Sequence, residues 1–158
     1  MANTQSMCTS FMGELMTATH NFGTAPTRGT STADTFKAAL YLASATVNAS
    51  TTAYSSTGEV TGTGYSAGGV TVTNATPPAS TNTSATAGTA YWTPSASITY
   101  TTVTLTTAFD AVLIYNSTQS NKAVSVHTFG SQTVTAGTFT LTMPSNTTST
   151  ALLRLATT

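Results

Sequence analysis

The feature that most constrains the fold of this chain is a period of two in its apolar side chains. Residues 138–144 (Thr-Phe-Thr-Leu-Thr-Met-Pro) alternate between threonine and a large apolar residue, and Pro144 closes the run. Residues 70–73, 96–106 and 123–129 alternate in a similar way. Successive side chains of a β-strand point to opposite faces of its sheet, so this period predicts half-buried strands.

The polar partner in this alternation is threonine, which supplies about a quarter of the 158 residues. Only 5% of the residues carry a charge, and the formal net charge is zero, whereas roughly 25% are charged in an average soluble domain. Disordered chains usually combine low hydrophobicity with high net charge. Threonine is β-branched and fits a pleated, half-buried surface. The composition therefore favours strands with hydroxyl groups facing water over disorder.

Other segments predict the character of individual strands and turns. Residues 36–42 and 109–115 are apolar at nearly every position, as expected for strands that are covered on both faces. The alternation in residues 96–106 changes phase after Tyr100, which predicts a β-bulge. Residues 58–69 hold five glycines, a density typical of positive φ angles or close backbone approach.

The strands and turns together predict an all-β fold. About eight short strands between turn clusters indicate an antiparallel β-sandwich or jelly-roll. Residues 10–22 are the only helix-like segment, with Phe11 and Leu15 at helical spacing. We therefore expect an N-terminal helical segment and loop over residues 1–34 and a β domain over residues 35–158. Residues 74–89, which include Pro77 and Pro78, are expected to form a long exposed loop.

The side chains suited to catalysis or metal binding are few and scattered. They are Cys8, Glu14, His20, Asp34, Glu59, Asp110 and His127. No two of the carboxylates are close in sequence, and neither histidine has a second ligand-type residue at metal spacing. We expect structural roles for both histidines, a buried thiol at Cys8, no enzymatic activity, no cofactor and no metal. Asp110, inside an apolar strand, predicts a partner such as Lys122 or a backbone amide, or alternatively a contact with a neighbouring subunit.

Charge and hydropathy also restrict the classes of partner. The four basic residues, Arg28, Lys37, Lys122 and Arg154, are too scattered to form the basic patch that nucleic-acid binding needs. No segment approaches the ~20 consecutive apolar residues of a membrane helix, and no signal peptide is apparent. We expect no nucleic-acid or membrane partner and synthesis in a cytoplasm. A surface with so few charges favours a protein packed against fixed partners.

The order of the segments in this chain resembles that in a widespread group of small structural proteins of tailed-bacteriophage particles. The segments that carry the resemblance are Ser10-Phe11, Glu14-Leu15, His20-Asn21-Phe22, Asp34-Thr-Phe-Lys-Ala-Ala-Leu-Tyr41, Thr52-Ala-Tyr54, Gly58-Glu-Val60, Gly62-Thr-Gly-Tyr-Ser-Ala-Gly-Gly69, Ala111-Val-Leu-Ile-Tyr-Asn116, Lys122-Ala-Val-Ser-Val126 and Phe129-Gly130. Members are labelled as virion, head or tail structural proteins. The resemblance implies a structural protein of a bacteriophage virion that is made in the bacterial host cytoplasm.

Within that class we expect a capsid decoration or cement subunit, bound to other virion proteins such as the major capsid protein and also self-associating. The alternative is a tail, fibre or host-recognition binding module. The predicted partner contacts are four large apolar side chains of the helical segment: Phe11, Met12, Leu15 and Met16. A short, weak helix with these side chains is expected to lie against another polypeptide or another copy. The competing prediction is that it folds back on its own sheet.

Overall fold

The computed structural model describes residues 2–16, 19–22, 33–81 and 88–156, and within them one helix and eight strands. The strands and the helix run in the order β1 (Ser6–Met7), α1 (Thr9–Met16), β2 (Phe36–Leu42), β3 (Val70–Thr71), β4 (Ala79–Ser80), β5 (Thr89–Trp92), β6 (Ile98–Asn116), β7 (Lys122–Leu141) and β8 (Leu153–Ala156).

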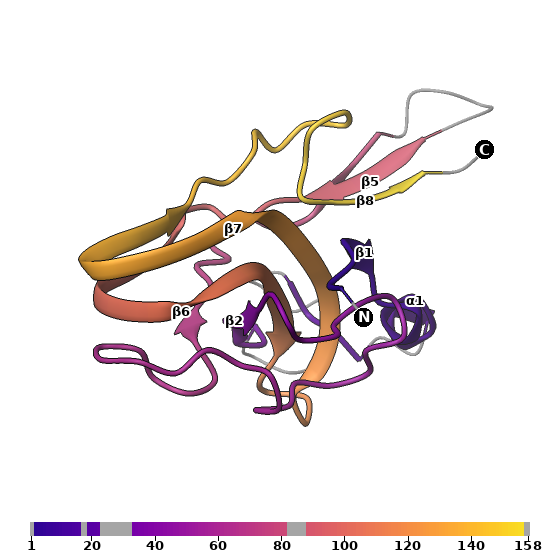
Figure 1. Ribbon diagram of the computed structural model, residues 1–158. Helices are drawn as coiled ribbons and strands as arrows, with labels where there is room; N and C mark the ends of the chain where they lie inside the picture. The colour runs from indigo at the N-terminus through magenta and orange to yellow at the C-terminus, as the bar shows by residue number, and fades with distance from the viewer. Residues whose placement is uncertain (1, 17–18, 23–32, 82–87, 157–158) are drawn as a thin grey trace.

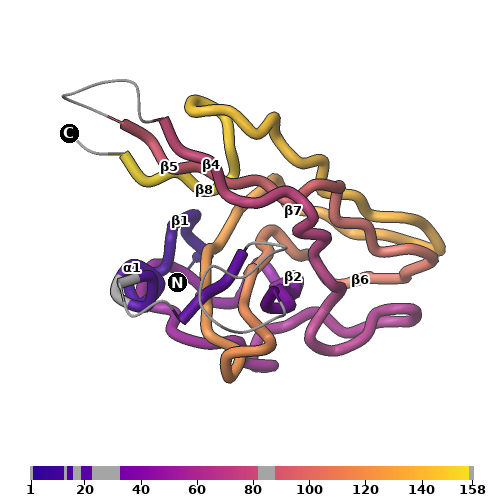
Figure 2. Tube along the Cα trace, turned by 180° about the vertical axis from the view of Figure 1, so that it is seen from behind, coloured from indigo at the N-terminus to yellow at the C-terminus, as the bar shows by residue number. Residues whose placement is uncertain are grey.

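The strands form two antiparallel sheets, which confirms the predicted all-β sandwich class. The larger sheet has the order β1-β7-β6-β2-β3, and the smaller has the order β4-β5-β8. In Figure 1 the small sheet projects from one end of the larger one, above β1 and α1, and Figure 2 shows the same arrangement from behind. Every strand pairing in both sheets is antiparallel.

Most of the larger sheet is one long hairpin, β6–β7, where the sequence predicted several short strands. β6 is 19 residues long and β7 is 20 residues long. The register between them shifts repeatedly between Tyr100 and Ala111, so the predicted bulge after Tyr100 is confirmed. The two strands curl sharply in this region (Figure 1). The curl brings the ring of Phe139 to 5.0 Å from that of Phe109 and 5.3 Å from that of Phe129.

The centre of the larger sheet is the part of β6 that was expected to be covered on both faces. Residues 111–115 are all at most 2% exposed. They lie between β2 on one side and β7 on the other. Tyr100, from the far end of the curled strand, donates a hydrogen bond to the carbonyl oxygen of Ala38 in β2 at 2.8 Å. The curled first half of β6 therefore lies over β2, which pairs with the second half of β6.

The glycine-rich segment of residues 58–69 pairs with β2 and β6, and it has the positive φ angles and close backbone approach that its composition predicted. Gly58, Gly64, Gly68 and Gly69 all have positive φ angles between 70° and 86°. A Cβ atom at Gly69 would overlap the carbonyl oxygen of Ala38. These glycines are thus required by backbone conformation and by close approach to β2 and β6.

The N-terminal segment is joined to the β-sheet by pairing and by burial. Ser6 and Met7 of β1 pair with Val126 and Ser125 of β7. Phe11 from α1 is 2% exposed, and its ring lies 5.9 Å from that of Phe22 in the core. The N-terminal region of residues 1–34, expected as a separate helical segment and loop, therefore contributes side chains from its described residues to the core of the β domain, and most of the expected loop lies outside the described part. Of the expected loop at residues 74–89, residues 79–80 form β4 and residues 82–87 lie outside the described part.

Candidate partner-binding groove

Polar side chains link the N-terminal segment to the sheet in one continuous network. The Nε2 atom of His20 lies 2.7 Å from Oε2 of Glu14, and Lys122 Nζ lies 2.7 Å from the other carboxylate oxygen. On the far side of the imidazole, Nδ1 of His20 lies 3.1 Å from Nδ2 of Asn116. Nδ2 of Asn116 also donates to Asp34 at 2.7 Å. Both ring nitrogens of His20 therefore have partners.

The amide of Asn116 fixes the protonation of His20. Its Oδ1 atom accepts hydrogen bonds from the backbone amides of Thr118 and Gln119, each at 3.1 Å. Nδ2 must therefore face His20, and because it is a donor, Nδ1 of the imidazole must be the acceptor. The proton then sits on Nε2 and is donated to Glu14. Burial lowers the pKa of His20, which favours this neutral form.

Hydrogen bonding also determines the charge of Glu14, the carboxylate that accepts a hydrogen bond from His20. Desolvation raises the pKa of Glu14, but the hydrogen bonds from Lys122 and His20 outweigh it, so the net pKa lies below its ordinary value. Glu14 is thus an ionised acceptor that ties α1 to Lys122 of β7. These bonds give His20 the structural role predicted for it.

Glu59 is a second buried carboxylate, which the sequence did not single out. The hydroxyl groups of Tyr54 and Tyr65 donate to its two oxygens at 2.6 Å and 2.7 Å, and the backbone amide of Gly68 donates at 2.7 Å. Desolvation, followed by the hydrogen bond to Glu59, raises the pKa of both tyrosines above the ordinary value. The carboxylate thereby orients Tyr65, whose hydroxyl oxygen accepts a hydrogen bond from the backbone amide of Leu40 in β2 at 3.0 Å, and this holds the glycine-rich segment against β2.

Asp110 and His127 also have partners within the chain. Nδ2 of Asn3 donates to Asp110 at 2.6 Å, so Asp110 has the partner within its own chain that one of its two predictions expected. That partner is Asn3 and not Lys122, which binds Glu14. His127 lies 2.9 Å from the hydroxyl group of Ser125, and burial lowers its pKa to about 4. Cys8 is buried as expected, and desolvation, then the charge of Glu14, raises its pKa to about 11.

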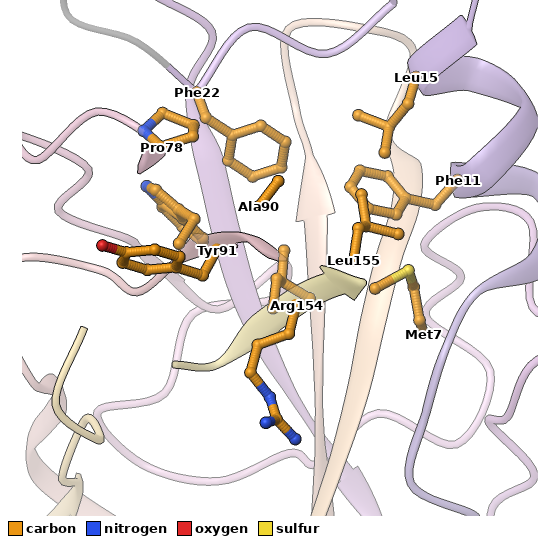
Figure 3. A pocket seen from close by; sticks show the side chains of 11 residues that line it. Met7, Phe11, Leu15, Phe22, Pro78, Ala90, Tyr91, Arg154 and Leu155 are labelled. Carbon is orange, nitrogen blue, oxygen red and sulfur yellow. The ribbon is translucent and has the colours of Figure 1, made fainter. Parts of the chain in front are cut away.

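An apolar groove opens between the N-terminal segment and the small sheet (Figure 3). Its volume is about 210 Å³. One wall comes from β1, α1 and the segment after it, and the other from the small sheet and the residues before β4. The lining residues are Met7, Phe11, Leu15, Phe22, Pro78, Ala90, Tyr91, Trp92, Leu153, Arg154 and Leu155. Because water gains few hydrogen bonds on such a surface, this groove is the best candidate for an interaction site.

Two of the four predicted partner-contact residues line this groove. Phe11 lines the groove but is only 2% exposed, so most of its side chain belongs to the core, and its role as a partner contact stays a prediction. Its ring lies 4.9 Å from that of His20, which shows how the helix folds back on its own chain. Leu15 is partly buried on the groove wall, Met12 is 46% exposed outside it, and the side chain of Met16 lies outside the described part.

Sequence reasoning missed the opposite wall of the groove. Trp92 is 3% exposed and packs on Phe22 at a ring distance of 4.7 Å. Leu155 is 41% exposed and belongs to β8. The available signal was the alternation of Leu153 and Leu155 around Arg154, which is typical of a strand but does not show which surface that strand faces.

Neither a metal centre nor a membrane span is found in the part of the chain that the structure describes. No group of three His, Cys, Asp or Glu side chains among those residues lies close enough together to hold a metal ion. No helix in the same part is long and apolar enough to cross a membrane. Comparisons with protein-family models, with curated proteins and with solved structures found no match for this chain.

Proposed function

We propose that this chain is a structural subunit of a bacteriophage virion, acting as a capsid decoration protein that binds other virion proteins and catalyses no reaction. The observation that carries the proposal is the open apolar groove on a protein with only 5% charged residues. A free monomer with so few charges has little to keep copies apart in solution. A subunit that remains bound in an assembly does not need charge repulsion to keep it apart from other copies.

The use of the titratable side chains supports a structural role. The carboxylates of Glu14, Asp34, Glu59 and Asp110 all accept hydrogen bonds within the chain. Catalysis requires such groups to converge on a space that substrate can enter. Here Glu14 and Asp34 are bound within the network of His20 and Asn116, and Glu59 and Asp110 bind other partners. These bonds hold the N-terminal segment, the residues before β2 and the glycine-rich segment in place.

The function is tested by measuring how many copies of the chain a purified particle contains. We expect the chain in purified virions at a copy number comparable with that of the major capsid protein, and on the head by immunogold labelling. A copy number that is a small fraction of this, with label on the tail, would support the tail or fibre alternative instead. Absence of the chain from purified particles would overturn the proposal.

A further inference from the structure

Strand β8 is the edge strand of the small sheet. In the part of the chain that the structure describes, β8 pairs with β5 on one side and ends the sheet on the other. An edge strand presents unpaired backbone N–H and C=O groups, which can pair with a strand of another chain. Proteins usually block such an edge with charges, proline or a bulge. β8 has a single charged residue, Arg154, and no proline.

This edge lies beside the apolar groove. In both Figure 1 and Figure 2, β8 lies between β5 and the N-terminal elements β1 and α1. Leu153 and Leu155 of β8 and Met7 of β1 all line the groove. β1 is itself the edge strand of the larger sheet. The groove therefore lies between an edge strand of the small sheet and an edge strand of the larger sheet.

The two faces of β8 differ in chemistry. Leu153 pairs with Trp92 and Leu155 pairs with Ala90, and all four residues line the groove. Arg154 pairs with Tyr91 between them. Both of these residues also border the groove, and alternation points their side chains toward the opposite face of the strand pair. Figure 3 shows the side chain of Arg154 running away from Phe11 and Leu15. A strand added beside β8 would meet apolar side chains on one face and a guanidinium group on the other.

The size of the groove fits a large apolar side chain. An apolar cavity of about 150 Å³ is enough to bind benzene, and this groove has about 210 Å³. On the opposite face, a carboxylate would complement Arg154, which is exposed and donates a hydrogen bond from Nη1 to the backbone oxygen of Thr148 at 3.3 Å. Cross-strand pairs of opposite charge stabilise a sheet, and pairs of like charge destabilise it.

We propose that β8 accepts an added β-strand from a partner protein, with the pattern apolar–acidic–apolar. The apolar residues enter the groove beside Leu153 and Leu155, and the acidic residue pairs with Arg154. Backbone hydrogen bonds supply affinity and the alternate side chains supply specificity, as in other cases of strand addition. The inference rests on the proposed function in taking the partner to be another virion protein.

The test uses the full chain and two peptides: acetyl-Thr-Thr-Leu-Glu-Leu-Thr-Thr-amide and the same peptide with lysine in place of glutamate. Trp92 is the only tryptophan in the chain and lines the groove, so its fluorescence reports occupancy directly. Backbone amide NMR shifts of residues 153–156 report pairing to β8. We expect the glutamate peptide to bind roughly tenfold more tightly than the lysine peptide, from the cross-strand charge term.

Two variants make the test specific. Arg154→Glu should reverse the preference between the two peptides, and Leu155→Asp should abolish binding of both, because it places a carboxylate in the groove. Equal binding of the two peptides, a preference that Arg154→Glu does not change, or no response from either peptide would overturn the proposal. These outcomes are independent of the copy number in virions: an abundant virion protein that binds neither peptide would leave the proposed function standing and this inference refuted.

Discussion

Nε2 of His20 lies 2.7 Å from Oε2 of Glu14, and this contact joins the end of the N-terminal segment to its helix. From there the network reaches β7 through Lys122 and β6 through Asn116. The rings of Phe11 and Phe22 lie 4.9 Å and 6.2 Å from the imidazole and 5.9 Å from each other. The segment is thus fastened to the sheet by polar bonds that are covered by aromatic rings.

This packing predicts that the N-terminal segment is required for folding. Deletion of residues 1–20 removes β1, α1 and His20, and it exposes the core around Phe22. We expect the truncated chain to lose cooperative unfolding, because burying one phenylalanine side chain stabilises a core by roughly 3–5 kcal/mol relative to alanine. The measurement is a urea titration followed by near-ultraviolet circular dichroism. A truncated chain that keeps a cooperative transition would show that the segment is not required for folding. Its apolar side chains would then be candidates for contacts with a partner.

The lowered pKa values of the two described histidines predict that the folded protein is less stable in acid. The pKa of His127 is about 4 in the folded state, against about 6.5 for an unperturbed histidine. Between these values the unfolded chain binds a proton that the folded chain does not, so stability is complete above about pH 6.5 and falls as the pH drops toward 4. The lowered pKa of His20 acts in the same direction.

For His127 the shift in pKa corresponds to a loss of up to about 3 kcal/mol in the free energy of unfolding. Urea midpoints measured between pH 7.5 and pH 4 should fall steeply for the wild type and less steeply for His127→Gln. The same pH dependence in the two proteins would show that His127 titrates normally in the folded state.

Two glycines form a matched pair for testing the close approach to β2. Gly69 has a φ of 70°, and an added Cβ would overlap the carbonyl oxygen of Ala38. Gly130 has nothing within 4 Å of an added Cβ. We expect Gly69→Ala to cost about 3 kcal/mol or more in the free energy of unfolding. Gly130→Ala should change it by less than about 0.5 kcal/mol. Equal, small effects in chemical denaturation would show that the glycine-rich segment is not held against β2.

The carboxylate of Glu59 is expected to contribute more to stability than any one of its donors. Glu59→Gln replaces one oxygen by an NH₂ group, which cannot accept a hydrogen bond from Tyr54, Tyr65 or the amide of Gly68. We expect a loss of about 2–4 kcal/mol, because a buried donor is left without an acceptor. Tyr54→Phe removes a single bond and should cost about 1 kcal/mol. If thermal unfolding gave the two variants the same stability, the carboxylate would not be the organising group.

The parts of the fold that the sequence predicted are those set by local pattern. The apolar run of residues 109–115 predicted a central strand, and its position between β2 and β7 confirms this. The glycines of residues 58–69 predicted positive φ angles, because few other residues adopt them. Both signals depend on neighbours in sequence, so they could be interpreted without knowledge of the tertiary structure.

The parts that were missed depend on contacts between distant segments. The break at Thr106 suggested a strand end, yet β6 continues through it because bulges absorb the change of phase. Asp110 was expected to have a partner such as Lys122 or a backbone amide, or to contact a neighbouring subunit, and its partner is Asn3, which is 107 residues away in sequence. Burial of Phe11 and formation of the groove required the small sheet to lie over the N-terminal helix. No periodicity in the chain encodes that placement.

The most direct test of the central claim is whether the groove attaches the subunit to the particle. Particles assembled without this chain are mixed with purified wild-type protein, with Leu155→Asp, or with Thr101→Asp, which adds the same charge at an exposed position of β6 outside the groove. Co-sedimentation then measures bound copies per particle. We expect saturable binding of the wild type and of Thr101→Asp. Leu155→Asp should remain folded but lose binding. Equal binding of all three proteins, or binding of none, would contradict the claim.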